Sequence, residues 1–258
     1  MKLLIANANT STRVTDIVAD AARRIASPGT ELALATAKFG ARIIASRTEI
    51  AIAQHAVLDT IAHHADDCDG VLIAASYDCG LRAARELTGK PVVALTEASL
   101  LAAAMVGERI GLVIWGKGAA ALHHEVIDTY GFAGRICGTR RLDLSPLETQ
   151  DDADRLDAAT VEASRALVDQ HGADVILLLG AMFSGRSFLI EDQVDAPVLD
   201  GVRCALPLLE AMVRMRPKRS VRGSYILPRG RECCGLSPDL ERQISRADGV
   251  SRDPDLGD

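Results

Sequence analysis

Short apolar runs alternate with segments of helical periodicity along most of this chain. The runs at Lys2–Ala6, Val71–Ala75 and Val175–Leu179 are nearly continuous, without the strict apolar–polar alternation of a half-exposed strand. Continuous runs of this length are typical of strands buried on both faces, as in parallel sheets covered by helices. Three further runs of this kind are Glu31–Thr36, Pro91–Leu95 and Ile110–Ile114. The sequence therefore predicts an α/β fold of parallel sheets flanked by helices.

The segments between the runs carry apolar residues at helical spacing. One helix is expected after the first strand, with Thr10, Ser11 or Thr12 as its cap. A second is expected near Ser46, where Ser46 and Glu49 have the spacing of a capping box. A long helix is expected before Val175, because apolar residues repeat with helical period from Leu156 to Leu167.

One strand–loop–helix–Pro–strand unit occurs twice. The same spacing of 106 residues separates Ala75 from Ala181 and Pro91 from Pro197. Such a repeat predicts two related α/β lobes that face each other. It also makes Ser76–Gly80 and Met182–Gly185 equivalent loops at the carboxyl ends of parallel strands, where open α/β sheets bind ligands.

Composition excludes several classes of protein. Apolar residues make up 48% of the 258 residues, so a large core is available. The net charge of −6 argues against a nucleic-acid partner, because binding to phosphate backbones draws on clustered Lys and Arg. No apolar run reaches the ~20 residues of a membrane span, and the N-terminal region shows no signal-peptide core. We expect a cytoplasmic protein with no membrane partner.

Cysteine and histidine patterns do not predict a metal site. The six cysteines include no CxxC pair, which also argues against a disulfide framework. Neighbouring residues on a helix point about 100° apart, so neither His63-His64 nor His123-His124 can chelate one ion from one face. These histidines are expected at the surface or at its boundary.

Five stretches, taken together and in this order, resemble the aspartate/glutamate/hydantoin racemase superfamily, and its hydantoin-racemase-like branch in particular. They are Ala6–Ser11, Gly40–Arg47, Ile73–Leu81, Thr96–Ser99 and Pro197–Val202. A sixth stretch, Gly223–Pro228, is similar to the C-terminal segment of that branch. The resemblance covers residues 1 to about 215 and is more specific for the fold than for the substrate.

The resemblance implies two pseudosymmetric lobes with the active site in a cleft between them. It also implies cofactor-independent proton transfer at a carbon next to a carbonyl, with one cysteine thiol on each face of the substrate. The resulting enolate would be held by loop N–H groups and by hydroxyl or amide donors. Asn7, Thr10 and Ser11 would supply such donors at the end of the first strand.

This chain departs from that pattern at both thiol positions, which hold Ala75 and Ala181. A methyl group cannot carry a proton, so the two-thiol mechanism is not predicted. Cys79 is the first substitute, because a helix N-terminus would lower its pKa and the adjacent Gly80 lets backbone N–H groups approach the substrate. Asp78 is the second. The structural alternatives are a small buried Cys79 and an Asp78 that caps the following helix.

Other residues of these loops are expected to contact a substrate. Ser76 and Ser184 are expected to stabilise the enolate, and Tyr77 is a further donor. Met182 and Phe183 would form apolar walls. Trp115 would either line the pocket or cover the junction of the lobes. Asp200 is expected to cap the helix that starts at Val202.

Three functions stay open. The first is a cofactor-independent racemase-type enzyme acting on a small hydantoin- or amino-acid-like substrate. The second is a decarboxylase or isomerase that needs one proton donor, and the third is a non-catalytic small-molecule-binding relative.

The lobes are expected to comprise residues 1–96 with 206–246, and residues 97–205. A tail over residues 247–258 is expected to be poorly ordered. We also expect a homo-oligomer, with the Ala-rich helix Ala98–Val106 offering a flat face.

Overall fold

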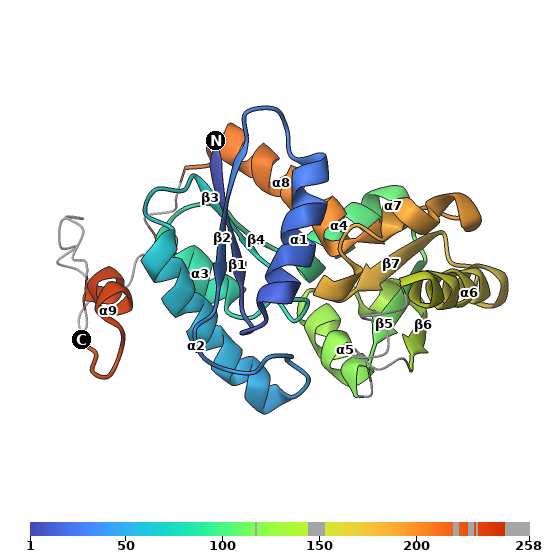
Figure 1. Cartoon of the computed structure of the whole chain (residues 1–258), viewed down its shortest axis with the longest axis horizontal. Coiled ribbons are helices and arrows are strands. Elements are labelled where there is room, and N and C mark those ends of the chain that lie inside the picture. Colours follow the sequence, from blue (N-terminus) through green and yellow to red (C-terminus); the bar gives the residue numbers. More distant parts are fainter. Residues whose placement is uncertain (117, 144–152, 219–221, 227–229, 231, 246–258) are drawn as a thin grey trace.

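The chain forms two four-stranded parallel sheets (Figure 1). The computed structural model describes residues 1–116, 118–143, 153–218, 222–226, 230 and 232–245. Sheet A has the strand order β2-β1-β3-β4 and sheet B the order β6-β5-β7-β8. Strands β5, β6, β7 and β8 thus repeat the order of β1, β2, β3 and β4. The predicted α/β fold is confirmed.

The strands of sheet A are β1 (Lys2–Asn7), β2 (Glu31–Thr36), β3 (Gly70–Ile73) and β4 (Val92–Ala94). The strands of sheet B are β5 (Ile110–Trp115), β6 (Ile136–Leu142), β7 (Val175–Leu179) and β8 (Val198–Asp200). The helices of the first half are α1 (Thr12–Ile25), α2 (Arg47–His64), α3 (Leu81–Thr88), α4 (Leu95–Val106) and α5 (Ala119–Thr129). The helices of the second half are α6 (Ala153–His171), α7 (Ser187–Ile190), α8 (Gly201–Met215) and α9 (Pro238–Ser245). The described residues also form three short 3₁₀ turns, η1 (Ala133–Arg135), η2 (Ala181–Phe183) and η3 (Glu191–Gln193).

Each central strand is buried on both faces, which explains the continuous apolar runs. In β1, Leu4 joins a core under α2 and α3, while Leu3 and Ile5 join a second core under α1 and α8. In β7, Ile176 and Leu178 pack toward α6, while Leu177 packs on the opposite face with α4 and α5. Since successive side chains of a strand point to opposite faces, two helical layers require apolar residues at every position.

Strand β6 is not among the strands that the apolar runs predict. It lies at the edge of sheet B, and its sequence, Ile-Cys-Gly-Thr-Arg-Arg-Leu, contains one buried residue, Leu142. An edge strand with one solvated face needs no continuous apolar run, so this segment does not resemble the buried strands.

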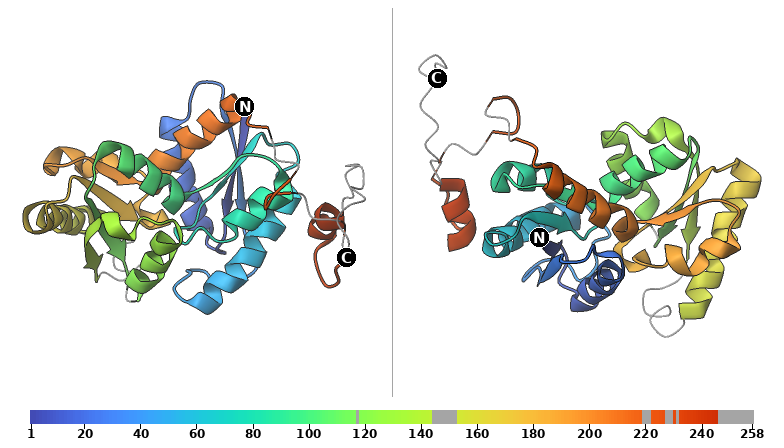
Figure 2. Two further views of the ribbon diagram at one scale, coloured as in Figure 1. Left: turned by 180° about the vertical axis from the view of Figure 1, so that it is seen from behind. Right: turned by 90° about the horizontal axis from the view of Figure 1, so that it is seen from above.

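Helices α4 and α8 cross at the junction of the two sheets (Figure 2). Helix α4 follows β4 of sheet A and contacts β7 of sheet B, whereas α8 follows β8 and contacts α1, β3 and β4. A Cβ on Gly201 would lie 2.9 Å from the Cβ of Leu95, so the absence of a side chain lets the two helices approach at their N-termini. Each lobe thus sends a helix to the other.

The predicted lobe boundaries, residues 1–96 with 206–246 and residues 97–205, stay a prediction. The tail over residues 247–258 lies outside the described residues, as do Leu227 and Pro228 of the sixth family-like stretch.

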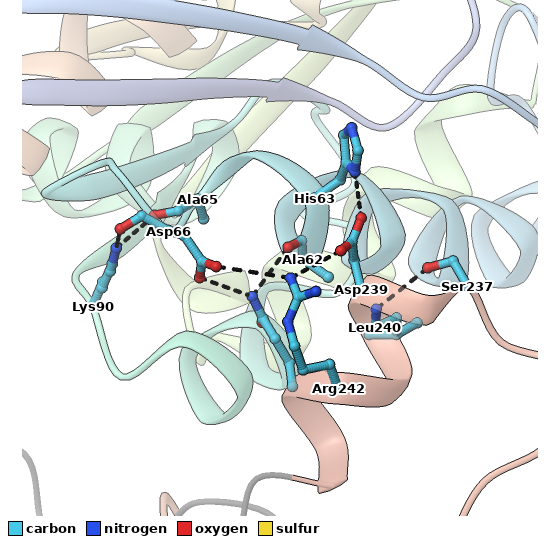
Figure 3. Close-up of polar contacts among 10 residues, drawn as sticks. Ala62, His63, Ala65, Asp66, Lys90, Ser237, Asp239, Leu240 and Arg242 are labelled. Carbon is cyan, nitrogen blue, oxygen red and sulfur yellow. Dashed lines mark hydrogen bonds and ion pairs between the residues drawn. The ribbon is translucent and has the colours of Figure 1, made fainter.

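Helix α9 docks beside α2 (Figure 3). Leu240 is buried against Ala62 and Leu87. Asp239 pairs with His63 and with Arg242, its neighbour one turn along the helix. Figure 1 places this helix at the end of the molecule that is remote from sheet B.

Candidate active site

The loop after β1 is organised by one buried amide. The side-chain N–H groups of Asn7 donate to Asn9 Oδ1, to the carbonyl of Ser11 and to Thr15 Oγ1, each at 3.0 Å. Asn7 Oδ1 accepts from the backbone N–H of Asn9 at 3.1 Å. Asn7 is fully buried, and its amide is committed to the turn that leads into α1. In this arrangement, Asn7 therefore has no free side-chain N–H group that could donate to an enolate, which was its expected role.

Thr10 and Ser11 lie half-buried at the same turn. The backbone N–H of Thr10 donates to the carbonyl of Ala41 at 3.0 Å. Ser11, one of the three residues expected as the cap, is the N-cap of α1, but its side chain makes no capping hydrogen bond.

The loop after β3 is tied to α5 of the other lobe. Ser76 Oγ lies 3.3 Å from Nε2 of His123, and the ring of Tyr77 lies 4.6 Å from the same imidazole, measured between centroids. Ser76 and Tyr77 are half-buried, whereas His123 is 2% exposed. The expectation that His123 lies at the surface is wrong. Burial raises the pKa of Tyr77 to about 12, with a smaller contribution from Cys79.

Asp78 caps a helix, but a different one from that expected. Its Oδ1 accepts from the backbone N–H of Thr96 at 2.9 Å, and its Oδ2 accepts from that of Glu97 at 2.8 Å. Both groups belong to the first turn of α4 rather than to α3. The hydroxyl of Tyr130, which follows α5, donates to Oδ2 at 2.8 Å.

The carboxyl group of Asp78 has a strongly altered acidity. Burial raises its pKa to about 7, against the hydrogen bonds from Thr96, Glu97 and Tyr130, which lower it. A carboxyl group with this pKa can take up or release a proton near neutral pH. Asp78 also has a φ of 48°, in the left-handed region that Asp and Asn tolerate better than most residues.

Cys79 is buried, with 1% exposure, in the core under α2 and α3. Burial raises the pKa of its thiol to about 12, with a smaller contribution from the charge of Asp78. The expectation that a helix N-terminus lowers this pKa is wrong, because desolvation of the thiolate outweighs any helix effect. The thiol is therefore protonated at neutral pH.

The loop after β7 packs against the first lobe. Ala181 and Met182 are half-buried against the core that lies between sheet A and α1 and α8. Ser184 is buried, and its hydroxyl donates to the carbonyl of Ala181 at 2.6 Å. This hydrogen bond lies within the loop and stabilises its conformation.

Two aromatic residues pack beside this loop. Phe183 is fully buried in the core of sheet B, so it is not accessible as the apolar wall of the site that was expected. Trp115 is half-buried at the end of β5, and its ring centroid lies 5.9 Å from that of Phe183.

Asp200 caps α8, as expected. Its Oδ1 accepts from the backbone N–H groups of Val202 and Arg203, each at 3.1 Å. Its Oδ2 accepts from the N–H of Gly185 at 3.1 Å and from the hydroxyl of Ser187 at 2.6 Å. Asp78 and Asp200 thus have similar capping roles, although they occupy different positions in the repeat: Asp78 lies in the loop after β3, whereas Asp200 ends β8. Each caps the helix after the last strand of its unit, and Asp200 also fixes the loop after β7.

Each of the two loops therefore contacts the opposite lobe at the junction. The first brings Ser76, Tyr77 and Asp78 to α5, and the second brings Ala181 and Met182 to the first lobe. Ala75, at one family thiol position, is 5% exposed. Among the described residues, no group of three His, Cys, Asp or Glu side chains is arranged to hold a metal ion. No described helix is long and apolar enough to cross a membrane.

The fold and this junction define a two-lobed α/β protein with one four-stranded parallel sheet in each lobe. The sequence model of the Asp/Glu/hydantoin racemase family matches residues 3–209, so the chain belongs to that family. This match confirms the expected family and the expected class of enzyme, a racemase-type isomerase.

Similar proteins span nearly the whole chain. It is 28% identical to the hydantoin racemase of Pseudomonas sp. (strain NS671) over 244 residues, which cover 94% of this chain and 98% of that protein. The structure of allantoin racemase from Klebsiella pneumoniae is similar with a TM-score of 0.87 and 27% identity, covering 93% of this chain and 98% of that one. Allantoin racemase from Pseudomonas fluorescens gives 0.86 and 29%, covering 91% and 100%. Arylmalonate decarboxylase, at 16% identity and a TM-score of 0.63, shares the fold.

Proposed function

We propose that this protein is a cofactor-independent racemase-type enzyme that moves a proton at a carbon next to a carbonyl of a small hydantoin- or amino-acid-like substrate. The observation that carries the proposal is the whole-length similarity to allantoin racemases, with the same two-lobed fold at 27% and 29% identity. Hydantoin and allantoin share a five-membered ring with a carbonyl beside the carbon that changes configuration. A ring of this kind suits a site between two loops that approach from opposite lobes.

The proton carrier must differ from that of the two-thiol pattern, because the side chains of Ala75 and Ala181 have no ionisable group that could transfer a proton. Of the two substitutes, we favour Asp78 over Cys79. The carboxyl group of Asp78 has a pKa of about 7, whereas the thiol of Cys79 has one of about 12 and stays protonated. A base must be deprotonated in part of the population at working pH.

The proton-bearing groups are unevenly divided between the two loops. Ser76, Tyr77 and Asp78 belong to the first, whereas the second offers the buried hydroxyl of Ser184, which is bonded to its own loop. A second candidate function follows from this asymmetry. A reaction that needs proton transfer on one face, such as a decarboxylation or a one-sided isomerisation, requires no partner at Ala181.

Solvent exchange in D₂O tests the proposal and separates these functions. Each enantiomer of 5-methylhydantoin is incubated with the protein, and deuterium uptake at C5 is compared with the appearance of the other enantiomer. Uptake with racemisation supports the racemase function. Uptake without racemisation supports one-faced transfer. The third function, a non-catalytic binding protein, is supported by binding with no uptake, which contradicts the proposal.

Variants of the first loop test the proton carrier. We expect Asp78→Asn to lower the exchange rate by about 10²–10⁴-fold and Cys79→Ala to leave it nearly unchanged. If Asp78 is the base, the wild-type rate should rise as the pH passes through about 7, and Cys79→Ala should keep that profile. An Asp78 that only caps α4 would leave the pH profile of Asp78→Asn like that of the wild type.

A further inference from the structure

The hydrogen bond between Ser76 and His123 joins the two lobes beside the first family thiol position. Ser76 directly follows Ala75 at the end of β3, and His123 lies in the second turn of α5. Ser76 Oγ and His123 Nε2 are 3.3 Å apart, which is within hydrogen-bonding range. Ser76 is half-buried and His123 is buried, so the serine is the more accessible member of the pair.

The direction of this hydrogen bond follows from the other ring nitrogen. His123 Nδ1 lies 2.9 Å from the carbonyl oxygen of Ala119, which can only accept. Nδ1 therefore carries the proton. A neutral imidazole has one N–H group, so Nε2 has none and must accept.

Burial keeps the imidazole neutral. Desolvation lowers the pKa of His123 to about 4, although the hydrogen bond to Ala119 favours the charged form. The ring is therefore uncharged at pH 7, and the bond to Ser76 has one direction: the hydroxyl of Ser76 donates to Nε2. If that hydroxyl turned away, Nε2 would be left as a buried acceptor without this donor.

A serine whose proton is donated in this way can only accept further hydrogen bonds. Its oxygen keeps lone pairs but has no second proton to offer. This differs from the expected role of Ser76, which was to donate a hydrogen bond to an enolate oxygen. A carboxylate or carbonyl oxygen facing Ser76 would meet another acceptor, whereas an N–H group would meet a partner.

We propose that Ser76, held by His123, accepts a hydrogen bond from a ring N–H next to the reacting carbon and so selects cyclic ureide substrates over carboxylates. The inference rests on the proposed function and names its substrate class. Ser76 is the specificity-determining residue, and His123 is the positioning residue that fixes its hydroxyl. Tyr77 supports the pair, because its ring packs against the imidazole.

Binding of matched ligands tests the role of Ser76. Dissociation constants are measured by calorimetry for 5-methylhydantoin, for 1,5-dimethylhydantoin, which lacks the N–H beside C5, and for methylmalonate. We expect the wild type to bind the first at least about tenfold more tightly than either of the others, the ratio that one hydrogen bond provides. In Ser76→Ala the preference for 5-methylhydantoin over its N-methyl analogue should fall to within about twofold.

Two further variants sharpen the comparison. Thr129→Val removes another hydroxyl of α5, one that donates to the carbonyl of Glu125 on the same helix, and should leave the ratios unchanged. His123→Leu frees the proton of Ser76 and should improve methylmalonate binding relative to 5-methylhydantoin. Circular dichroism verifies that each variant is folded. Equal wild-type affinities for the two hydantoins, or a preference that survives Ser76→Ala, would overturn the inference.

The hydrogen-bond direction can be measured without any substrate. Nitrogen-15 NMR of the wild type should show His123 as the neutral Nδ1–H tautomer at pH 7. The Nε2–H tautomer or a charged ring would overturn the inference even if hydantoins bind. Deuterium uptake with equal affinity for both hydantoins would remove the role of Ser76 and leave the proposed function intact. No binding of any hydantoin would overturn both.

Discussion

At the residue scale, Asp78 shows what local sequence can and cannot predict. Its position after a strand and shortly before a predicted helix predicts a capping carboxylate, and it is one. The helix it caps begins 17 residues further along the chain, because β4 returns beside β3 and brings the start of α4 next to the loop. Tyr130, 52 residues away, completes the site. The spacing of residues in the sequence cannot predict these hydrogen-bond partners, because they come close to Asp78 only when both sheets have formed.

The raised pKa of Asp78 predicts a specific pH dependence of stability. In the unfolded chain an Asp has a pKa of ~3.9, and in the folded protein that of Asp78 is about 7. The folded state therefore holds the proton more tightly. The contribution of Asp78 is complete below ~pH 4 and is lost as the pH rises through about 7.

Replacing Asp78 by Asn removes this dependence. We expect the loss of unfolding free energy between pH 5 and pH 8 to be smaller in Asp78→Asn than in the wild type, by about 2–3 kcal/mol. Asn also tolerates a left-handed backbone, so the loop is preserved. Urea unfolding at the two pH values measures the difference, and Asp128→Asn, at an exposed position of α5, serves as control. Equal changes in the wild type and Asp78→Asn would contradict the prediction.

Cysteine accessibility gives a second prediction at this scale. The exposed thiol of Cys234 should react with iodoacetamide in the native protein at pH 8, whereas Cys79 should react about 10³-fold more slowly. The reason is that alkylation requires a thiolate, and burial raises the pKa of Cys79 to about 12. Mass spectrometry of peptides from native and urea-unfolded protein measures both rates. Rapid native labelling of Cys79 would show that the loop opens and would restore it as a proton carrier.

At the element scale, the strands buried on both faces were predictable and the helix crossings were not. Continuous apolar runs mark β1, β3, β5 and β7, because helices cover both faces of their sheets. The edge strand β6 has a mixed sequence and was missed. The helical periodicity of the sequence predicts which residues of α4 and α8 face inward, but it does not predict which sheet each helix covers. That each crosses to the other lobe depends on the direction in which the chain leaves β4 and β8.

Helix α8 is fixed to the first lobe by a buried carboxylate. Glu210 accepts from the backbone N–H of Ser27 at 2.9 Å, from the hydroxyl of Ser27, and from Thr30 Oγ1 at 2.7 Å. Burial tends to raise its pKa, but the hydrogen bonds from Ser27 and Thr30 prevail, and the net shift is downward. Because the folded pKa is lowered, this stabilisation is present above the unfolded value of ~4.3 and is lost as the pH falls below it.

Glu210→Gln tests that attachment. The amide keeps the shape of the side chain but loses one acceptor and the charge, so the variant should be less stable than the wild type by about 1–3 kcal/mol at pH 7. The difference should narrow as the pH drops toward 3. Urea unfolding followed by circular dichroism measures it. Glu125→Gln, which removes an exposed ion pair with Arg47, should lower the stability much less than Glu210→Gln. Equal effects of the two substitutions would mean that the Glu210 site does not hold α8.

At the scale of the whole molecule, the repeated unit in the sequence corresponds to a repeated strand order in the structure. The spacing of 106 residues from Pro91 to Pro197 brings the chain to the start of β4 and of β8 in turn. The two halves differ where they meet. The first loop presents Ser76, Tyr77 and Asp78 to α5, and the second packs Ala181 and Met182 against α1 and α8. The repeat of the two halves could thus be predicted from the spacing of residues in the sequence. The difference between the two loops at the junction could not, because it depends on contacts between the lobes.

The last prediction concerns association of whole molecules through α4. The inner side of this helix, with Ala98 and Ala103, is buried in the core, so the flat Ala-rich face expected from the sequence is partly internal. Its outer side keeps an apolar stripe, with Leu101 48% and Met105 76% exposed. Leu101 also lines a hollow of about 490 Å³ together with Leu208 and Met212 of α8. Apolar side chains gathered in this way on one surface are typical of a subunit interface.

We expect the wild type to form a symmetric dimer at about 10 μM, because a two-fold axis places the same stripe on both partners. The double change Leu101→Glu and Met105→Glu should give a folded monomer, since like charges would face each other across the axis. Light scattering measures the mass and circular dichroism the fold. The matched pair Ile43→Glu and Ile52→Glu, at exposed positions near the start of α2, should leave the dimer intact. A wild-type monomer at this concentration would contradict the prediction and would mean that the stripe on α4 stays in contact with water.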